Sequence, residues 1–226
     1  MLDISVLGLT PTAVNAMLVT VILSLFFVIA GVKIKKADPS EPPRGFVLVM
    51  ELLFTGVTHF TKEQVGVAGS KYVPFIMTVG AYLLLANLLG LFGFRPPTID
   101  INVTVALSLM TLIYIMVSGV FAQGFGGYLK AVFVGPASSA PPVIKQFIIL
   151  INVISELTKL ISLSFRLFGN IVSGTLLVVL FSMLPLWTSP ALPLLNAYFD
   201  VFAGLMQTMV FCILMMMWLK TATVRE

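Results

Sequence analysis

Charged residues are scarce in this chain of 226 residues, making up 10% of the sequence, whereas 59% is hydrophobic. The mean hydropathy is +1.09. Soluble globular domains carry about 25% charged residues, so the composition excludes a water-soluble fold and indicates a membrane protein. Because a spanning helix needs about 20 apolar residues, the length fits about five membrane-embedded helices in a single membrane domain, 1–226.

Cysteine and histidine each occur only once, as Cys212 and His59. A single cysteine excludes an internal disulfide, and nothing in the sequence indicates a metal or a cofactor. Metal-dependent proteolysis would need a pattern such as HExxH, and a serine mechanism would need a partnered serine and histidine. We therefore expect no catalytic residue, and no enzyme activity of this chain on its own.

The net charge of +4 does not predict a nucleic acid partner, because such binding needs basic residues clustered on one exposed face. Here the basic residues flank apolar runs. With the amino terminus outside, ten of the 13 basic residues fall on the cytoplasmic side and only Arg95 falls outside. Cytoplasmic loops are rich in Lys and Arg, so we expect the amino terminus outside and the carboxyl terminus in the cytoplasm.

Apolar runs separated by polar, proline-rich or glycine-rich loops predict an all-α polytopic membrane protein. The segment 45–65 is interrupted by Glu51, His59, Lys62 and Glu63, which favours an interfacial amphipathic helix, with a span as the alternative. The remaining segments are a first span, 13–32, a hairpin of spans, 72–94 and 101–122, a long helix, 143–184, and a return helix, 194–219.

The segment 143–184 contains no proline and little glycine, so it predicts one continuous helix. At the standard rise it would extend about 63 Å, twice the hydrocarbon thickness. Such a helix must tilt steeply, bend or run partly along the membrane plane. Together with the return helix it forms a long tilted hairpin near the carboxyl terminus.

One face of the long helix is polar. At 100° per residue its polar side chains fall within a sector of about 100°; they are Asn152, Glu156, Lys159, Arg166, Asn170 and Ser173. The return helix has a sparser polar stripe of Asn196, Asp200 and Gln207. If the stripes face each other, they can line a wet path, which is how proteins carry ions through hydrocarbon.

Glu156 and Lys159 are three residues apart and can pair on the helix surface. A structural pair near the cytoplasmic boundary and a role in an ion path are both open interpretations.

Arg166, which we expect to be buried in the membrane, has no acid within four residues on its helix. Its guanidinium does not lose its proton under protein conditions, so it cannot relay one. It can instead attract a carboxylate and force that group to release its ion. The carboxylate belongs either to another chain or, as the alternative, to Asp200.

The segment 162–174, SLSFRLFGNIVSG, resembles the signature around the essential arginine of subunit a of F-type ATP synthases, in the bacterial branch. Further similarity lies in ANLLGL at 86–91, PPTIDINVTVALSL at 96–109 and LMQTMVF at 205–211. The resemblance covers nearly the whole chain. It implies an ion-translocating stator subunit beside a ring of rotating c subunits, held by peripheral stalk b subunits and the remainder of the complex in the lipid bilayer.

The resemblance implies two half-channels and a ring carboxylate that gives up its ion when it meets Arg166. Asn170 and Gln207 match family positions near this arginine. Many relatives have an acid or histidine where this chain has Thr175. The outer half-channel is therefore expected to rest on four residues, namely Asp200, assisted by Asn196, Thr175 and Asp100. The resemblance leaves an inner-channel role for Glu156 open, since only some bacterial relatives have an acid there.

The resemblance also implies a multi-pass protein of the bacterial plasma membrane, with an organellar inner membrane as the alternative. The ion, H⁺ or Na⁺, stays open because the selecting ligands are expected on the ring. The alternative function is a self-contained secondary transporter or channel. Transporters usually show internal repeats and broken helices at mid-membrane, and neither is found in this sequence.

Overall fold

The computed structural model describes residues 10–36, 42–92, 94–130, 132, 142–183, 194 and 197–223. These residues contain helices and turns but no strand. Five of the described helical segments are long and apolar enough to cross a membrane, namely Pro11–Lys36, Gly69–Phe92, Ile101–Gln123, Gln146–Ser182 and Val201–Thr223. The predicted all-α polytopic membrane fold is confirmed.

The helices are α1 (Pro11–Lys36), α2 (Phe46–Val65), α3 (Val73–Leu88), α4 (Ile101–Gln123), α5 (Phe125–Leu129), α6 (Pro142–Ser182) and α8 (Gly204–Thr223). Short 3-10 turns, η2 (Val67–Tyr72), η3 (Leu89–Phe92) and η4 (Pro97–Ile99), lie before and after α3 and before α4. A π-helical turn, η8 (Phe199–Ala203), leads directly into α8.

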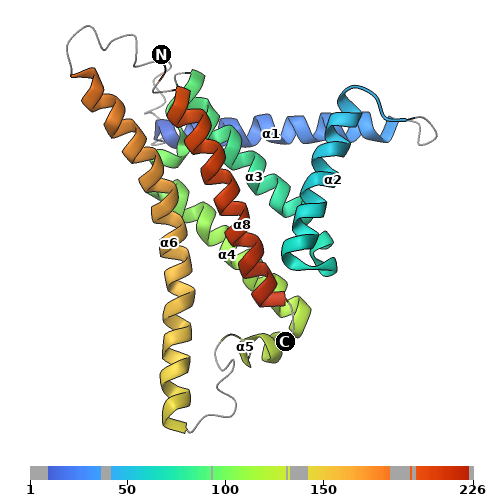
Figure 1. Ribbon diagram of the computed structural model, residues 1–226, viewed down its shortest axis with the longest axis vertical. Helices are drawn as coiled ribbons and strands as arrows, with labels where there is room; N and C mark the ends of the chain where they lie inside the picture. Colours follow the sequence, from blue (N-terminus) through green and yellow to red (C-terminus); the bar gives the residue numbers. More distant parts are fainter. Residues whose placement is uncertain are drawn as a thin grey trace.

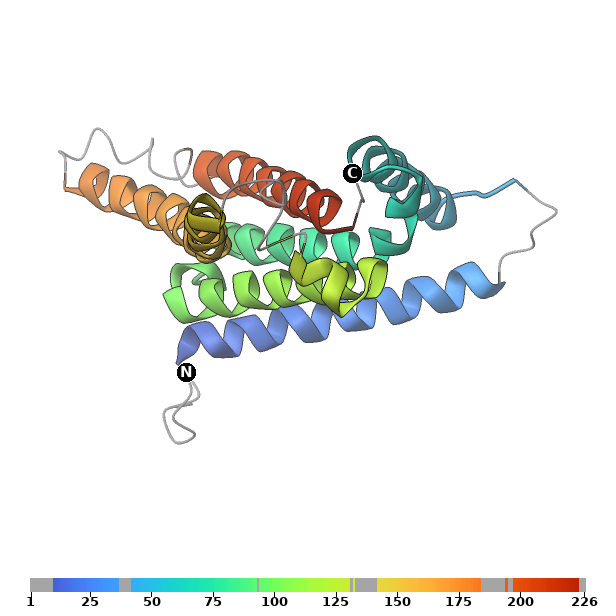
Figure 2. The same ribbon diagram turned by 90° about the horizontal axis from the view of Figure 1, so that it is seen from below.

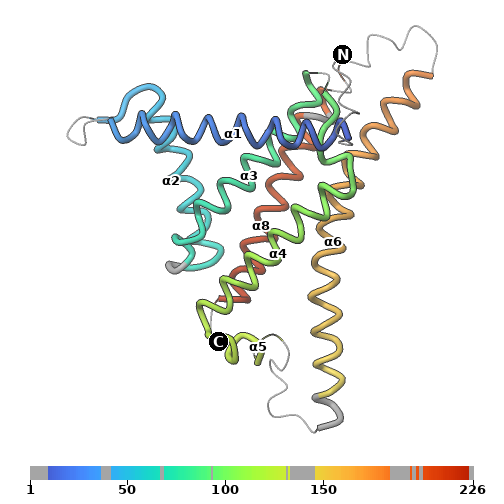
Figure 3. Tube along the Cα trace, turned by 180° about the vertical axis from the view of Figure 1, so that it is seen from behind, coloured from blue at the N-terminus to red at the C-terminus, as the bar shows by residue number. Residues whose placement is uncertain are grey.

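The helices are arranged in layers, as Figures 1 and 2 show. α3 and α4 form the middle layer, α1 lies on one face of it, and α6 and α8 lie on the other. α1 runs across the direction of α6, a crossing that Figure 3 shows from behind. If α1 crosses the membrane along its normal, α6 therefore lies closer to the membrane plane, as its length requires.

Side chains from α2, α3, α4, α5, α6 and α8 form the buried core, including Leu83 of α3, Leu167 of α6 and Phe211 of α8. α4 contributes mainly small buried residues, Thr104, Ser108, Thr111, Ser118 and Gly119. Small residues let helices approach closely in membranes. This stripe explains how α4 packs against both α6 and α8.

α1 differs from the core helices because most of its apolar side chains are exposed. Val21, Leu25 and Val28, for example, are 59–66% exposed. An exposed helix that is apolar nearly all round suits contact with lipid rather than with water.

α6 is a single helix of 41 residues, about 62 Å long at the standard rise. It bends between its yellow first half and its orange second half (Figures 1 and 3). In the first half and near the bend, Ser155, Thr158 and Ser164 each donate to the carbonyl four residues earlier, a contact that often bends helices. α6 and α8 run antiparallel but splay, so they touch each other only over a short stretch.

Candidate functional site

A groove of about 680 Å³ lies between α6 and the start of α8. We call it the Arg166 groove. One wall is the polar face of α6, and the other is formed by η8 and α8. The polar and small residues that line it are Arg166, Gly169, Asn170 and Ser173 on the first wall and Ala203 and Gln207 on the second. Three residues singled out from the sequence, Arg166, Asn170 and Gln207, are therefore brought together.

The side chain of Arg166 is exposed, so the chain by itself does not enclose it. α6 lies at the outside of the layered fold, and its arginine projects from that surface. Burial of Arg166 in the membrane stays a prediction. Among the side chains that the structure describes, the close contacts between a basic and an acidic group are His59–Glu63 and Glu156–Lys159, and neither includes Arg166. The side chain of Asp200, the alternative partner, lies outside the described part.

Two amides lie at the Arg166 groove, and one of them connects its walls. Nδ2 of Asn170 donates to the carbonyl oxygen of Ala203 at 3.3 Å, which ties α6 to the end of η8. Gln207 is only 5% exposed, and its Nε2 has no hydrogen-bond partner among the described residues. Buried amides are nearly always bonded, so the Nε2 of Gln207 is a donor at the groove for which the described residues supply no acceptor.

The second wall is not a plain α-helix, because η8 inserts a π-turn at Phe199–Ala203. The predicted stripe of Asn196, Asp200 and Gln207 assumed an uninterrupted α-helix. One additional residue in a turn shifts the side-chain register by about 100°, so that assumption is corrected at η8. The backbone of Asp200 lies inside this turn, whereas Asn196 lies outside the described residues.

A second polar cavity, of about 180 Å³, lies where α4, α5, α6 and α8 meet. We call it the Glu156 cavity. Glu156 and Lys159 form an ion pair at its wall, and Gln123 and Tyr128 line it as well. Tyr128 is 4% exposed, and burial, followed by the charge of Glu156, raises the pKa of its phenol. This cavity is separate from the Arg166 groove.

Asp100 and Thr175 lie in other surroundings. Asp100 caps α4: its Oδ1 accepts from the backbone N–H of Asn102 at 2.9 Å, and its Oδ2 accepts from Oγ1 of Thr12 at 2.8 Å. The hydroxyl of Thr12, then the Asn102 amide, lowers the pKa of this carboxyl. Thr175 is exposed and donates to the carbonyl of Ile171 in its own helix.

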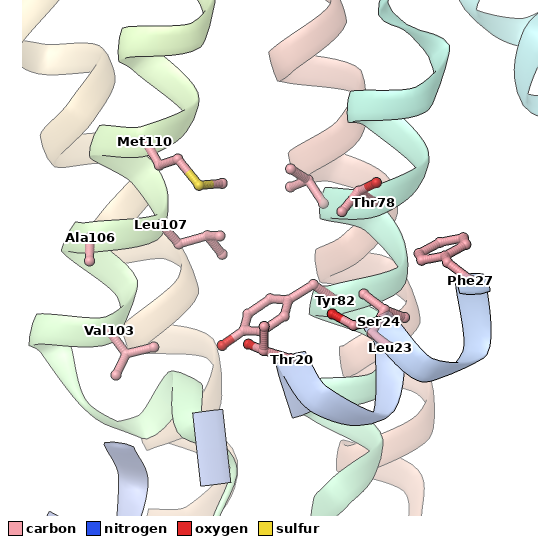
Figure 4. A pocket seen from close by; sticks show the side chains of 11 residues that line it. Thr20, Leu23, Ser24, Phe27, Thr78, Tyr82, Val103, Ala106, Leu107 and Met110 are labelled. Atoms are coloured by element: carbon pink, nitrogen blue, oxygen red, sulfur yellow. The ribbon is translucent and has the colours of Figure 1, made fainter. Parts of the chain in front are cut away.

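A third cavity, of about 380 Å³, lies between α1, α3 and α4. Figure 4 shows apolar side chains such as Leu107 and Met110 on one side and the ring of Tyr82 extending from α3 toward them. Its hydroxyls come from Thr20, Ser24, Thr78 and Tyr82, and none of the described residues that line it is charged. A path for ions through hydrocarbon needs polar groups along its length, so this cavity is a poor candidate for one.

Sequence reasoning missed Asn87 of α3. Asn87 is 1% exposed. Its Oδ1 accepts from Oγ1 of Thr98 at 3.1 Å, and its Nδ2 donates to the carbonyl oxygen of Gly204 at 3.5 Å. An amide alone in an apolar run must find partners inside the protein, and that signal was available within ANLLGL. Its partner Gly204, 117 positions further along the chain, could not be inferred.

These observations define the class of protein as a polytopic helical membrane protein with a charged groove between two of its spans. Residues 14–220 match the family model described as "ATP synthase A chain". The chain is 33% identical to ATP synthase subunit a of Campylobacter hominis over 97% of this chain and 93% of that one. It is 32% identical to the subunit a of Aquifex aeolicus over 92% and 95%, respectively.

The chain therefore belongs to the ATP synthase A chain family. It is a membrane-embedded stator subunit of an F-type ATP synthase.

Proposed function

We propose that this subunit passes H⁺ or Na⁺ to and from a rotating ring of c subunits, and that Arg166 is the gate. The observation that carries the proposal is the groove itself. It presents a permanent cation on the outer face of an apolar helix, and none of the described side chains of this chain neutralises that cation. A carboxylate on a neighbouring subunit supplies the missing charge.

The gate works through the protonation state of that carboxylate. When the carboxylate comes near the guanidinium, its charged form is favoured and it releases its ion. Because Arg166 keeps its own proton, the ion cannot leak past through the arginine. Asn170 and Gln207 shape the groove from both walls, the first through its bond to Ala203 and the second through an Nε2 donor that no described residue bonds.

Two separate paths lead to the gate. We assign Asp200, Asn196 and Thr175 to the outer half-channel. The inner half-channel begins at the Glu156 cavity, where the Glu156–Lys159 pair, Gln123 and Tyr128 provide polar walls. Asp100 acts mainly as a structural residue that holds α1 and the start of α4 together, because its two carboxylate oxygens already accept hydrogen bonds from Asn102 and Thr12.

The subunit lies in a bacterial plasma membrane, with its amino terminus outside and its carboxyl terminus in the cytoplasm. α2 lies at the cytoplasmic interface: it exposes Leu48 and Leu52, and its His59–Glu63 pair is largely exposed as well. Lys33 at the end of α1 lies 5.0 Å from the centre of the Phe46 ring, which connects the two helices there. Peripheral stalk b subunits hold this membrane domain against the rotation of the ring.

The experiment is Arg166→Ala in the assembled ATP synthase. ATP hydrolysis by the soluble head is expected to continue, while ATP-driven ion pumping into membrane vesicles disappears. Arg95→Ala is the matched control, because it removes an exposed guanidinium outside the groove and should leave pumping unchanged. Full coupled pumping by the Arg166→Ala enzyme would overturn the proposal.

A further inference from the structure

We infer that Asn87 of α3 is a positioning residue for ion translocation: it fixes η8 against α3 and thereby sets the width of the Arg166 groove. The predicted effect on ion translocation rests on the proposed function. The structural part of the inference rests on contacts between α3, η8 and α8. Asn87 does not line the groove, so it acts through the backbone of another element.

The second wall of the Arg166 groove begins with an irregular turn. A π-turn is rarer than an α-turn and occurs mostly as a single turn inside an α-helix. Because it shifts the register of everything before it by about 100°, the groove keeps one geometry only if η8 is held in place. The sequence of η8 itself, FDVFA, contains no proline or glycine to impose the turn.

The end of η8 is held from two sides. From the α6 side, Asn170 donates to the carbonyl oxygen of Ala203. From the α3 side, Asn87 donates to the carbonyl oxygen of Gly204, the next residue. Thr98 in η4 donates to Oδ1 of Asn87, which orients the amide so that its Nδ2 points at α8.

The contact between α3 and α8 also requires a glycine. A Cβ added at Gly204 would lie 2.9 Å from Cβ of Asn87, closer than carbon atoms pack. Gly204 and Asn87 therefore set how near α8 comes to α3, and Gln207 follows one turn later on α8. A shift of this contact would move Gln207 relative to Arg166 across the groove.

Two changes test the inference by different means. Asn87→Leu removes the amide at similar size, and Gly204→Ala forces the helices apart without removing any hydrogen-bonding group. Thr78→Val is the matched control, because Thr78 lies on α3, is exposed and bonds only within its own helix among the described residues. Thr98→Val removes only the bond that orients Asn87, so it serves as a milder variant if a stronger one fails to assemble.

The first measurement is a distance across the groove. Spin labels at Ser173→Cys and Val210→Cys, one on each wall, are introduced together with Cys212→Ala in an assembled complex that is otherwise free of cysteine. Double electron–electron resonance is expected to show a shifted or broadened distance between the two labels with Asn87→Leu and Gly204→Ala. The change should be smaller with Thr98→Val and absent with Thr78→Val.

The second measurement is ion pumping per assembled complex, without labels. Asn87→Leu should lower it about fivefold, the effect of one lost hydrogen bond on a positioned group. Lower assembly together with an unchanged distance and normal pumping per complex would overturn the inference, since Asn87 would then only stabilise the fold. The distance measurement does not depend on pumping, so failure of the Arg166 proposal would be seen separately.

Discussion

The two polar sites on α6 differ in how their charge is balanced. In the Glu156 cavity the cation of Lys159 pairs with Glu156, and the two side chains are only 26% and 23% exposed. In the Arg166 groove, two turns further along the same helix, the cation is exposed and lacks an ion-pair partner among the described side chains.

The difference shows which site can work alone. An isolated charge inside a membrane costs several kcal/mol, whereas a paired charge is largely compensated. The Glu156 cavity is enclosed by four helices of this chain and is neutral as it stands. The Arg166 groove is incomplete, and it faces outward, where another subunit can complete it.

The largest expected effect comes from removing the cation from each site in turn. Arg166→Ala should lower ATP-driven pumping at least about 100-fold, since it removes the electrostatic group on which ion release depends. Lys159→Ala should lower it less than about tenfold. Proton uptake by inverted vesicles, normalised to ATP hydrolysis, measures the loss in each variant. Similar losses at the two positions would contradict the contrast between the two sites.

The next effect concerns whether Glu156 and Lys159 act as a pair. Removing one partner leaves the other charge partly buried and uncompensated. If the pair is structural, Glu156→Gln with Lys159→Met should pump better than either single variant, by about threefold, as a coupling energy of about 0.5–1 kcal/mol predicts. Pumping rates of the four proteins in this double-mutant cycle supply the measurement.

A role of Glu156 in the ion path predicts the opposite order. The double variant would then pump no better than Glu156→Gln alone, and the Glu156 cavity would be part of the path itself rather than its wall. This result would assign both sites on α6 to the ion and would weaken the contrast between them.

The sequence was sufficient for the long helices and for part of the site. The absence of proline from 143–184 predicted α6 as one helix, and the spacing of Arg166 and Asn170 placed them on one face, both of which the structure shows. The splay of α6 from α8 was not predictable, because each of these two helices packs more extensively against α4, earlier in the chain, than against the other.

The π-turn and its contacts could not be predicted from the sequence either. η8 has no glycine or proline within it, and amides from α3 and α6, far away in the chain, donate to the carbonyl oxygens of Gly204 and Ala203 at its end. Periodicity assumes an ideal helix, so it placed Asp200 and Gln207 on one stripe. Two such residues share one face only where no π-turn changes the register of the helix between them.

A smaller effect is expected from disturbing the Glu156 cavity through its packing. A Cβ at Gly119 would lie 2.5 Å from the ring of Tyr128, so Gly119→Ala should displace that ring and destabilise the protein by about 1–3 kcal/mol. Gly126→Ala on α5 is the matched control, since nothing lies within 4 Å of the added atom. Thermal unfolding of the purified complex in detergent distinguishes the two variants; equal melting temperatures would show that Tyr128 does not need Gly119.

The smallest effect concerns Asp100, which lies away from both sites on α6 and should change stability rather than pumping. Asp100→Ala removes the cap of α4 and the bond to Thr12, which should lower the free energy of unfolding by about 1 kcal/mol. Asp100→Asn keeps a good capping residue and loses only the charge.

Because the pKa of Asp100 in the folded state lies below its ordinary value of 3.8, its ionised form stabilises the fold above that value, and this contribution is lost as the pH falls through the folded pKa. The difference in melting temperature between the wild-type protein and Asp100→Asn should therefore be present at pH 7 and shrink below about pH 4. A loss of pumping in Asp100→Asn at unchanged stability would instead place Asp100 in the outer half-channel, so that the ion path would extend to the contact between α1 and α4.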